Sequence, residues 1–505
     1  MRLFIFAIGG TGSRVLKSLI MLSAAGVKPL DESGQKIKAF EIIPIIVDPH
    51  KSNEDLKRTD VLLSNYSTIR RRLYGDSDEA EGFFATKIST LRSIMKDTSV
   101  NLTDTFIFNL STVEKCKFRD FINYDTMSES NHALTSLLFA DYQLENKMNI
   151  GFVGSPNIGS IALNQIKDSD EFKAFANILT NDDRIFFISS IFGGTGASGF
   201  PILVKNIRNA QNLNVANKEF LRRAPIGALT VLPYFNIQHT DDGRIDKADF
   251  IVKTQSALQY YNETLTNDTD AQINELYYLG DSISSLPYQY DPGENGQKNN
   301  AHLIEMIGAL APLKFAGTPD YKLRDQNGYP LKTAAYEYGL ETDTNEVTFK
   351  AFGASTRHLL YNDMVKFHLL YMYLKNGFEK NIGKGYTQDA PEIRNEFTAT
   401  DFYRTLDTQF FTAYVDWLGE MRNNNRSVNL FDYLSADMNN VISGVGTKKT
   451  WVGHKSISCD SFLSEMNRLS RDNKSYSAGH EEFKLFDLFN RAADNLLPDK
   501  YENIN

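Results

Sequence analysis

The sequence predicts an α/β fold, with a mostly parallel sheet, helices on both of its faces and a mainly helical C-terminal region. Three glycine-rich turns are the main evidence, at residues 9–14, 154–159 and 193–199. Each turn follows an apolar run whose composition suits a buried strand. If these strands share one parallel sheet, the turns meet at its carboxyl edge, where open α/β sheets bind ligands.

The first turn follows residues 2–8, which are expected to form a strand, and residues 15–20 are expected to continue as a helix. The turn itself is Gly-Gly-Thr-Gly-Ser-Arg. Glycine allows positive φ angles and lets a ligand approach the backbone without a Cβ between them. A strand, a glycine turn and a helix in this order aim free backbone amides at a phosphate group.

The turn at residues 193–199, Gly-Gly-Thr-Gly-Ala-Ser-Gly, is the most informative stretch of the chain. It follows the apolar run 185–192 and precedes an expected helix, with Pro201 near the first helical position, where a missing N–H costs nothing. Between the other two turns, residues 149–153 are expected to form a further strand that runs into the turn at 154–159. Packing alone does not readily explain three such turns.

Length and composition set the class of protein. The chain has 505 residues, more than one ordinary core, so two domains or one enlarged domain are expected. Its two cysteines, Cys116 and Cys459, form neither a disulfide framework nor a zinc-binding spacing, which fits a reducing cytoplasm. The net charge of −9 argues against non-specific nucleic-acid binding. No apolar run is long enough for a membrane span.

The order and wording of the turns resemble the tubulin/FtsZ superfamily of GTP-binding proteins. The resemblance covers roughly residues 1–317 and also includes Val-Asp-Pro at 47–49. In the last glycine turn, Ala197 stands where the family has Ser or Thr. Residues 226–235 resemble the strand that ends in the family's ribose loop, with one extra residue before Pro233. The chain is therefore similar to divergent, prokaryotic FtsZ-like proteins.

This resemblance implies binding of GTP or GDP with Mg²⁺. Backbone amides of the first and last turns would hold phosphates, Asp48 would reach Mg²⁺ through water, and an Asn at the start of a central helix, about 299–317, would read the purine edge. Arg244 is a candidate for the sugar or base. The nucleotide-binding residues implied are Gly9, Gly10, Thr11, Gly12, Ser13, Arg14, Asp48, Gly154, Ser155, Pro156, Asn157, Gly159, Gly193, Gly194, Thr195, Gly196, Ala197, Ser198, Gly199, Pro233, Arg244, Asn299 and Asn300.

Two alternatives stay open on the residues alone. Asn299 and Asn300 also suit plain helix caps. Residues 9–14 also resemble the glycine turn of some NAD(P)-binding proteins, in which Arg14 would accept a 2′-phosphate and Asp48 would select the ribose. A dinucleotide fold does not predict the second glycine turn at Gly193, and this turn favours the tubulin-like interpretation.

The chain departs from the family after the central helix. The expected Asn-x-Asp loop is missing; residues 311–320 contain Pro312, which would kink or stop the helix, and Asp320 is the carboxylate best placed to substitute as the catalytic group. We expect a GTP-binding domain at residues 1–317 and a mainly helical domain at 318–505. Apolar spacing after about residue 349 predicts helices at 359–374, 410–421, 430–442 and 483–497.

Two functional hypotheses follow from the resemblance. In the first, the chain is a nucleotide-gated scaffold or switch in a multi-protein bacterial system, such as membrane remodelling or defence, with slow or absent GTP hydrolysis. The C-terminal helical region would then bind a protein partner or a second copy. In the second, the chain is a polymerising cytoskeletal GTPase, with Asp320 acting across a subunit contact. The missing Asn-x-Asp loop favours the first hypothesis.

Overall fold

The computed structural model describes the 505-residue chain except for a set of short segments. These are residues 51–52, 97–101, 111–112, 114–115, 151, 153–154, 235, 238–246, 268–271, 282–286, 289–297, 341–343, 452, 473–475, 477–478 and 505.

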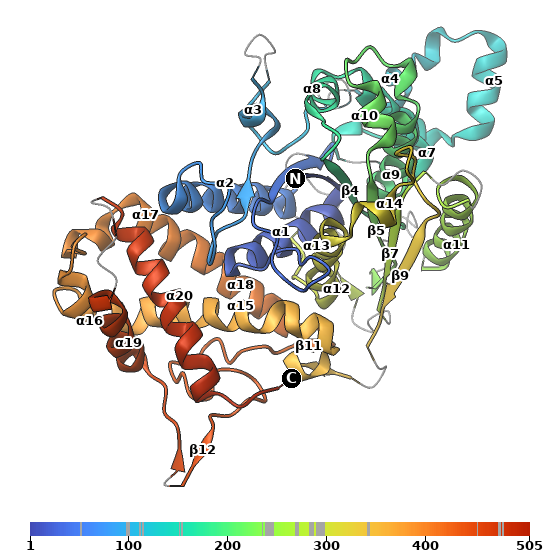
Figure 1. Ribbon diagram of the computed structural model, residues 1–505. Coiled ribbons are helices and arrows are strands. Elements are labelled where there is room, and N and C mark those ends of the chain that lie inside the picture. Colours follow the sequence, from blue (N-terminus) through green and yellow to red (C-terminus); the bar gives the residue numbers. More distant parts are fainter. Residues whose placement is uncertain are drawn as a thin grey trace.

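A seven-stranded sheet forms the centre of the molecule (Figure 1), and every pair of neighbouring strands in it is parallel. Its order is β3-β2-β1-β4-β5-β7-β9, so the direction in which strands are added reverses between β1 and β4. The predicted fold class is confirmed. The strands are β1 (Arg2–Ile8), β2 (Glu41–Val47), β3 (Lys87–Ile88), β4 (Arg184–Ser190), β5 (Ile226–Val231), β7 (Glu275–Leu279) and β9 (Ala334–Tyr338).

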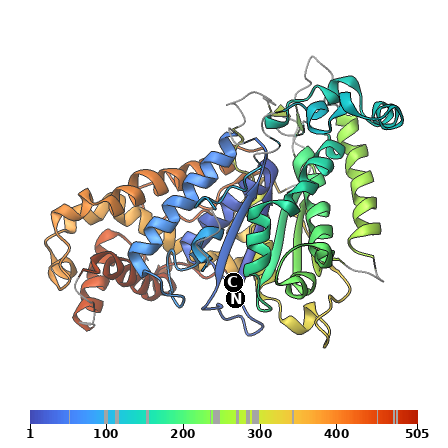
Figure 2. The ribbon, with the colours of Figure 1, turned by 90° about the horizontal axis from the view of Figure 1, so that it is seen from above.

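Helices cover both faces of this sheet, as Figure 2 shows from above. The central strands are therefore apolar on both sides, as buried parallel strands require. In the first part of the chain the helices are α1 (Gly9–Ala25), α2 (Glu54–Tyr74), α3 (Leu91–Ile94), α4 (Phe118–Phe121), α5 (Glu129–Leu138), α6 (Asp141–Leu144), α7 (Pro156–Leu163), α8 (Asp170–Ile178), α9 (Gly194–Arg208), α10 (Lys218–Arg223), α11 (Lys247–Thr264), α12 (Leu303–Gly308), α13 (Leu310–Gly317) and α14 (Asp320–Leu323).

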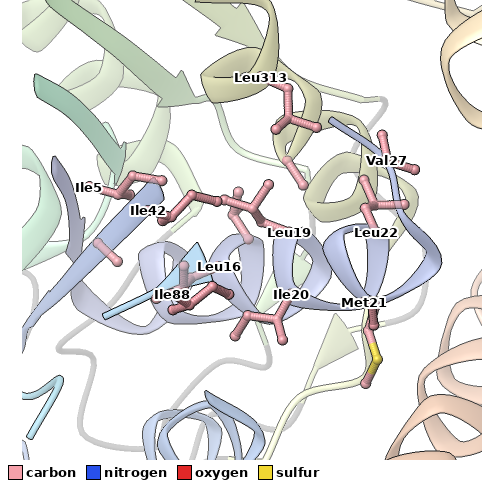
Figure 3. Packing of buried hydrophobic residues seen from close by; sticks show 14 of the residues in the cluster. Ile5, Leu16, Leu19, Ile20, Met21, Leu22, Val27, Ile42, Ile88 and Leu313 are labelled. Atoms are coloured by element: carbon pink, nitrogen blue, oxygen red, sulfur yellow. The ribbon is translucent and has the colours of Figure 1, made fainter. Parts of the chain in front are cut away.

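The two faces of the sheet have different apolar layers. On one face, α1 and α13 meet the strands, and Figure 3 shows Leu19 of α1 beside Ile42, with Ile5 next to Ile42 and Leu313 of α13 nearby. On the other face, the Phe187 ring of β4 lies 5.6 Å from the Phe200 ring of α9. Since alternate residues of a strand point to opposite faces, this arrangement fixes which side chains each helix contacts.

The C-terminal region is mainly helical and lies beside α1 and α2, away from α9 (Figures 1 and 2). Its helices are α15 (Ala354–Tyr373), α16 (Glu379–Asn381), α17 (Asp401–Arg404), α18 (Phe411–Arg422), α19 (Cys459–Asp472) and α20 (Glu481–Lys500), with π turns at Leu374–Phe378 and Thr405–Phe410. Two short strand pairs also lie there: β10 (Glu346–Val347) with β11 (Ser427–Val428), and β12 (Lys449–Thr450) with β13 (Gly453–His454). A third short pair, β6 (Asn236–Ile237) with β8 (Pro287–Tyr288), belongs to the first part of the chain.

The helices expected at 359–374, 410–421 and 483–497 are present as α15, α18 and α20. The helix expected at 430–442 is wrong: this stretch is irregular and closes on itself through a bridge between Phe431 and Ile442. Its polar residues bond nearby backbone instead, for example Asp437 Oδ1, which accepts from the N–H of Asn439 at 2.9 Å. Such local side-chain bonds compete with helix formation.

The strand expected at 149–153 is wrong where it is described, because Met148–Ile150 forms a 3₁₀ turn. The position beside β2 that a third strand would take is already filled by β3 and by a parallel bridge between Ile46 and Ile107. The division of the chain at residue 317 stays a prediction; β9, which pairs with β7 at the edge of the sheet, follows that residue. Among the described helices, none is both long and apolar enough to cross a membrane.

Candidate functional site

The N-termini of α1 and α9 meet at the carboxyl edge of the sheet. β1 and β4 are neighbours in register, with Ala7 opposite Ile188, and each is followed by its glycine-led helix. A Cβ built on Gly9 would lie 3.6 Å from the backbone nitrogen of Gly196. In the described residues, no side chain caps either helix. The N–H groups of two first turns therefore gather at one place, where an anion is favoured.

The glycines of these turns have different structural roles. A Cβ on Gly12 would lie 2.7 Å from the carbonyl carbon of Ala7, so Gly12 lets α1 lie close to β1. A Cβ on Gly196 would lie 2.8 Å from the carbonyl oxygen of Ser190, so Gly196 does the same for α9 and β4. Gly10 differs, because its nearest neighbour would be the Arg14 guanidinium at 3.6 Å. Gly10 is partly exposed, and a Cβ there would make only ordinary contacts, with the Arg14 guanidinium and the Asn53 side-chain amide.

Pro201 lies inside α9, not near its first position, because the helix already begins at Gly194. In an α-helix the N–H at position 201 would bond the carbonyl of Ala197, and proline has no N–H. The Tyr261 hydroxyl of α11 donates to that carbonyl at 3.3 Å. The glycine turn is thus the start of α9 itself, and the hydrogen bond that Pro201 cannot donate to Ala197 is donated by Tyr261 of another helix.

The turn at 154–159 also comes to this place. A Cβ on Gly159 of α7 would lie 2.2 Å from Ser198 Oγ and 3.0 Å from the carbonyl oxygen of Gly194. The first turns of α7 and α9 are therefore in close contact. Ser155 precedes α7 as its N-cap residue, Pro156 occupies the first helical position and Asn157 follows it. Gly154 lies outside the described residues.

The family resemblance also implies phosphate contacts by the hydroxyls of Thr11, Ser13, Thr195 and Ser198, but these hydroxyls do not all face open space. Ser198 Oγ donates to the Gly194 carbonyl at 2.6 Å, and Ser13 is completely buried in the first turns of α1. Thr11 and Thr195 are nearly buried beside the two helix N-termini. Contacts to phosphate by these side chains stay predictions, and the backbone amides are the better placed donors.

Asp48 follows β2 directly and lies at the same edge, since Val47 is in register with Ile8. Its carboxylate is buried and accepts a hydrogen bond from the N–H of His50 at 2.9 Å. Burial raises the pKa of Asp48 to about 7. In the described part of the chain, no group of three or more acidic, His or Cys side chains could hold a metal ion. A metal at Asp48 would therefore need ligands from a phosphate and water, which is how Mg²⁺ is usually held.

Arg14 is buried next to Gly10 and bonds three side chains from distant parts of the sequence. Its Nε donates to Glu305 at 2.6 Å, and its Nη atoms donate to Asp55 at 3.1 Å and to the Tyr234 hydroxyl at 2.9 Å. The Tyr234 hydroxyl in turn donates to Glu305 at 2.7 Å. Since two carboxylates already hold Arg14, its role here is to join α1, α2 and α12 rather than to offer a free cation.

Asn299 lies before the central helix and not in it. The structure begins α12 at Leu303, with His302 as its N-cap, and Glu305 Oε2 accepts from the His302 N–H at 3.2 Å. The central helix is then broken at Ala309, shortly before Pro312, as the proline predicts. Neither asparagine caps the helix, so that alternative is wrong. The Asn299 amide donates to Asp55 at 2.9 Å, whereas Asn300 is exposed.

The remaining predicted residues lie at both edges. Pro233 follows β5 closely, at the carboxyl edge, and Arg244 is outside the described residues. Asp320 is at the opposite edge: it bonds Arg324 at 2.8 Å, and Arg324 contacts Asn181, just before β4 begins. The length of β4 separates it from the glycine turns by roughly 20 Å. Asp320 therefore does not reach the glycine turns of its own chain.

Sequence reasoning missed the carboxylates that hold Arg14. Asp55 and Glu305 are polar residues on helices that otherwise pack against apolar neighbours, and both are almost completely buried. A charged residue on an otherwise apolar helix face indicates a buried, paired charge, and this pattern is present in the sequence at both positions. It does not say which cation the carboxylate will meet, because the partners are far apart in sequence.

The sheet order and the two glycine-led helices define an open, doubly wound α/β protein with its candidate site at the strand-order reversal. No protein-family model and no curated protein matches the chain. Among solved structures, the chain is similar to a GTPγS-form protofilament of TubZ from Bacillus thuringiensis serovar israelensis, with 12% identity, 55% of this chain and 47% of that chain covered and a TM-score of 0.21. A helical model of a TubZ-Bt two-stranded filament gives 12% identity, 55% and 46% coverage and a TM-score of 0.20. Each match spans less than half of the solved chain, and at these scores it carries no argument about function.

Proposed function

We propose that this chain binds a guanine nucleotide, GTP or GDP with Mg²⁺, as a divergent, prokaryotic tubulin/FtsZ-like protein, and that it acts as a nucleotide-gated scaffold or switch. The observation that supports this most is the contact between two glycine-led helix N-termini, in which Gly9 lies against Gly196. One such N-terminus is a common strand–helix junction. Two that face each other at a strand-order reversal match the needs of a polyphosphate.

The phosphate end of the ligand would lie between α1 and α9. Backbone amides of Gly10 and Thr11 in α1, and of Thr195 and Gly196 in α9, are the proposed donors. Backbone dipoles provide the positive potential locally, so the net charge of −9 does not oppose binding. Asp48, at the same edge, is the proposed Mg²⁺-side carboxylate; the ion would neutralise charge on the phosphates.

The base end would lie toward Asn299. Its side-chain amide is already oriented by Asp55, which leaves its carbonyl oxygen available to a purine edge. Asp55 also bonds Arg14 of α1, so one buried carboxylate joins the proposed base contact to the helix whose N-terminus carries proposed phosphate donors. This shared carboxylate supports a single ligand that spans both ends.

Slow or absent hydrolysis is proposed because the carboxylates are engaged elsewhere. Asp55 and Glu305 hold Arg14, and Asp320 lies at the opposite edge of the sheet. General-base catalysis needs a carboxylate within hydrogen-bond reach of the attacking water. A nucleotide that persists at the site suits a switch, whose bound and free states present different surfaces to a partner through the C-terminal helices.

A polymerising GTPase is the second candidate, favoured by the position of Asp320. Its side chain is 54% exposed at the amino edge, where it would face the carboxyl edge of another copy stacked head to tail. In that arrangement Asp320 would act on the neighbour's nucleotide.

Titration calorimetry of the purified chain with GTP, ATP and NAD, each with and without Mg²⁺, tests the proposal. We expect binding of GTP and GDP that Mg²⁺ strengthens, and weaker binding of ATP. Tight binding of NAD with no response to GTP would contradict it. That result would support the dinucleotide alternative, which the sheet order and the position of Asp48 also fit.

A further inference from the structure

The four residues before α12 form an irregular segment that three helices hold in place. The N–H and side-chain amide of Asn299 donate to Asp55 of α2, at 3.1 and 2.9 Å. The N–H of His302 donates to Glu305 of α12. The hydrogen bonds at Ala301 come from the C-terminal region. A segment without regular structure is thus held by hydrogen bonds at its first residue and at its last two residues.

Glu420 of α18 and Asn424, which follows the end of this helix, bond the backbone of Ala301. Glu420 Oε2 accepts from the Ala301 N–H at 3.0 Å. Asn424 Nδ2 donates to the Ala301 carbonyl oxygen at 2.7 Å and to the Glu420 carbonyl oxygen at 2.9 Å. Both backbone groups of one residue are therefore bonded by one element. Such pairing fixes the orientation of the peptide planes on each side of Ala301.

Glu420 is also the counter-ion of two cations, the buried Lys17 and the partly buried Arg58. Its carboxylate bonds Lys17 of α1 at 3.0 Å and Arg58 of α2, and its side chain is only 12% exposed. Although burial alone would raise the pKa of Glu420, Lys17 and Arg58 hold it below its ordinary value, so the group is ionised at neutral pH. The same helix is anchored to α1 by Trp417, whose Nε1 donates to Ser18 Oγ at 3.1 Å. Figure 1 shows α18 beside α1.

We propose that Glu420 is a positioning residue for the base end of the nucleotide site, so that the C-terminal helical region sets base selectivity. This inference rests on the proposed function. Two hydrogen bonds to the Asp55 carboxylate orient Asn299, one from its backbone N–H and one from its side-chain amide. The bonds at Ala301 hold the other end of the same short segment, so the backbone between the two residues is fixed on both sides. Base recognition depends on the orientation of donors and acceptors, and an Asn299 whose segment is released at Ala301 should discriminate less.

The competing explanation is that Glu420 only joins two regions of the fold. The chain offers a matched control for it. Glu482 of α20, almost completely buried, bonds Arg72 of α2 at 2.7 Å. This ion pair also joins the C-terminal helices to α2, and neither of its residues contacts residues 299–302. A purely structural effect would appear equally in variants of Glu420 and Glu482.

The test measures the Kd values of GTP and ATP, with Mg²⁺, for the full chain and for the variants Glu420→Gln, Asn424→Ala and Glu482→Gln. Melting temperatures are measured in parallel. We expect the preference for GTP over ATP to fall about tenfold in Glu420→Gln and several-fold in Asn424→Ala, the range of one buried hydrogen bond. Glu482→Gln should lower the melting temperature and leave the preference unchanged.

Asn424→Ala removes neutral hydrogen bonds and leaves no charge unpaired, so it tests the inference even if Glu420→Gln, which removes the bonded carboxylate of Lys17, does not fold. An unchanged preference in Asn424→Ala and in any folded Glu420→Gln would overturn the inference while the proposed function stands. An equal loss of preference in Glu482→Gln would overturn it as well. If the unaltered chain binds neither nucleotide, the proposed function fails, and this inference with it.

Discussion

The hydroxyl of Tyr261 donates a hydrogen bond to the carbonyl oxygen of Ala197, the carbonyl that Pro201 cannot bond. Ala197 belongs to the first turns of α9, within the glycine stretch that carries the proposed phosphate donors. Both residues are buried, and the Tyr261 ring lies 5.2 Å from the Phe200 ring. A residue of α11 thus completes the start of α9.

This relationship predicts coupling between Tyr261 and Pro201. Tyr261→Phe should lower the free energy of unfolding by about 1–3 kcal/mol, because a buried carbonyl loses its donor. In a Pro201→Ala background the same change should cost less, since the introduced alanine provides the helical N–H. Urea unfolding of the two single variants and the double variant measures this. Additive effects would show that the hydroxyl does not replace the missing bond.

The neighbouring glycines of α1 should respond differently to alanine. Gly10→Ala should fold normally, because its new Cβ has no neighbour closer than 3.6 Å, and should weaken GTP binding by crowding the phosphate. Gly12→Ala should cost about 1–3 kcal/mol of stability, because its Cβ would lie 2.7 Å from backbone of β1. Melting curves and calorimetry separate the two effects.

Gly339→Ala is the matched control for both, since a Cβ there meets nothing within 4 Å. It should change neither stability nor binding. Normal GTP affinity in Gly10→Ala would remove the proposed phosphate site from the N-terminus of α1.

Asp48 should make Mg²⁺-dependent binding sensitive to pH. Burial raises its pKa to about 7, so the ligand-free protein holds a proton there that Mg²⁺ must displace. GTP affinity in Mg²⁺ should therefore fall by up to about tenfold per pH unit below 7. The variant Asp48→Asn should bind GTP weakly, and its affinity should depend less on pH. The dependence that remains would come from protonation of the nucleotide phosphates. Calorimetry at pH 6, 7 and 8 tests this, and parallel profiles would contradict it.

The same carboxyl affects stability in the opposite sense. Its folded pKa lies above the unfolded value near 4, so the folded state binds the proton more tightly. In the absence of ligand, its contribution to stability is therefore present at low pH and lost as the pH rises from about 4 to about 7. Asp48→Asn should remove this loss, and urea unfolding of the ligand-free protein at pH 5 and 8 measures it.

His368 should contribute to acid sensitivity. It is completely buried, stacks on Phe431 at 4.2 Å, and burial lowers its pKa to about 3. Because the folded pKa is depressed, its stabilising contribution is present above about pH 6.5 and lost as the pH falls toward 3. Between pH 7.5 and 5.0 the unaltered chain should lose about 2 kcal/mol more than His368→Phe.

Urea unfolding at the two pH values measures that difference. Tyr414→Phe is the control, because it removes the hydroxyl that faces His368 Nδ1 at 3.3 Å without removing a group that titrates in this range. An equal loss of stability in His368→Phe and the unaltered chain would contradict the prediction.

Asp320 distinguishes the two candidate functions. If the chain is a switch or scaffold, phosphate release from GTP per molecule should be slow and independent of protein concentration. If copies assemble so that Asp320 acts on a neighbour, the rate should climb steeply with concentration, and Asp320→Ala should abolish the rise. Asp325→Asn, a second exposed carboxylate nearby, is the control. Pelleting with GTP, measured alongside, reports assembly itself.

The fold class could be predicted because local patterns decide it. Apolar runs before glycine turns predict strands followed by helices, and β1, β4 and their helices follow that pattern. The failures have physical reasons of two kinds. Residues 430–442 have helical spacing of apolar side chains, but Asp and Asn bonds to nearby backbone hold them irregular. Residues 149–153 have strand-like composition, but the sheet position is taken by β3.

The candidate site was predictable only in its backbone part. Glycine turns are contiguous in sequence, so their meeting at one edge follows from a parallel sheet. The cluster around Arg14 is not contiguous: Glu305 and Tyr234 are far from it along the chain, and nothing local to either residue indicates the contact. The start of the central helix was misplaced for a similar reason, since His302 and Glu305 form a capping box that apolar spacing does not show.

The ion pair between Lys17 and Glu420 also bears on how the chain folds during its synthesis. The two residues are 403 positions apart, so at about 5–20 residues per second α1 leaves the ribosome about 20–80 s before its counter-ion exists. During that interval the Lys17 ammonium lacks the carboxylate that bonds it. We expect the nascent sheet to keep α1 loosely docked until α18 emerges, so that a helix of the C-terminal region completes the packing of α1.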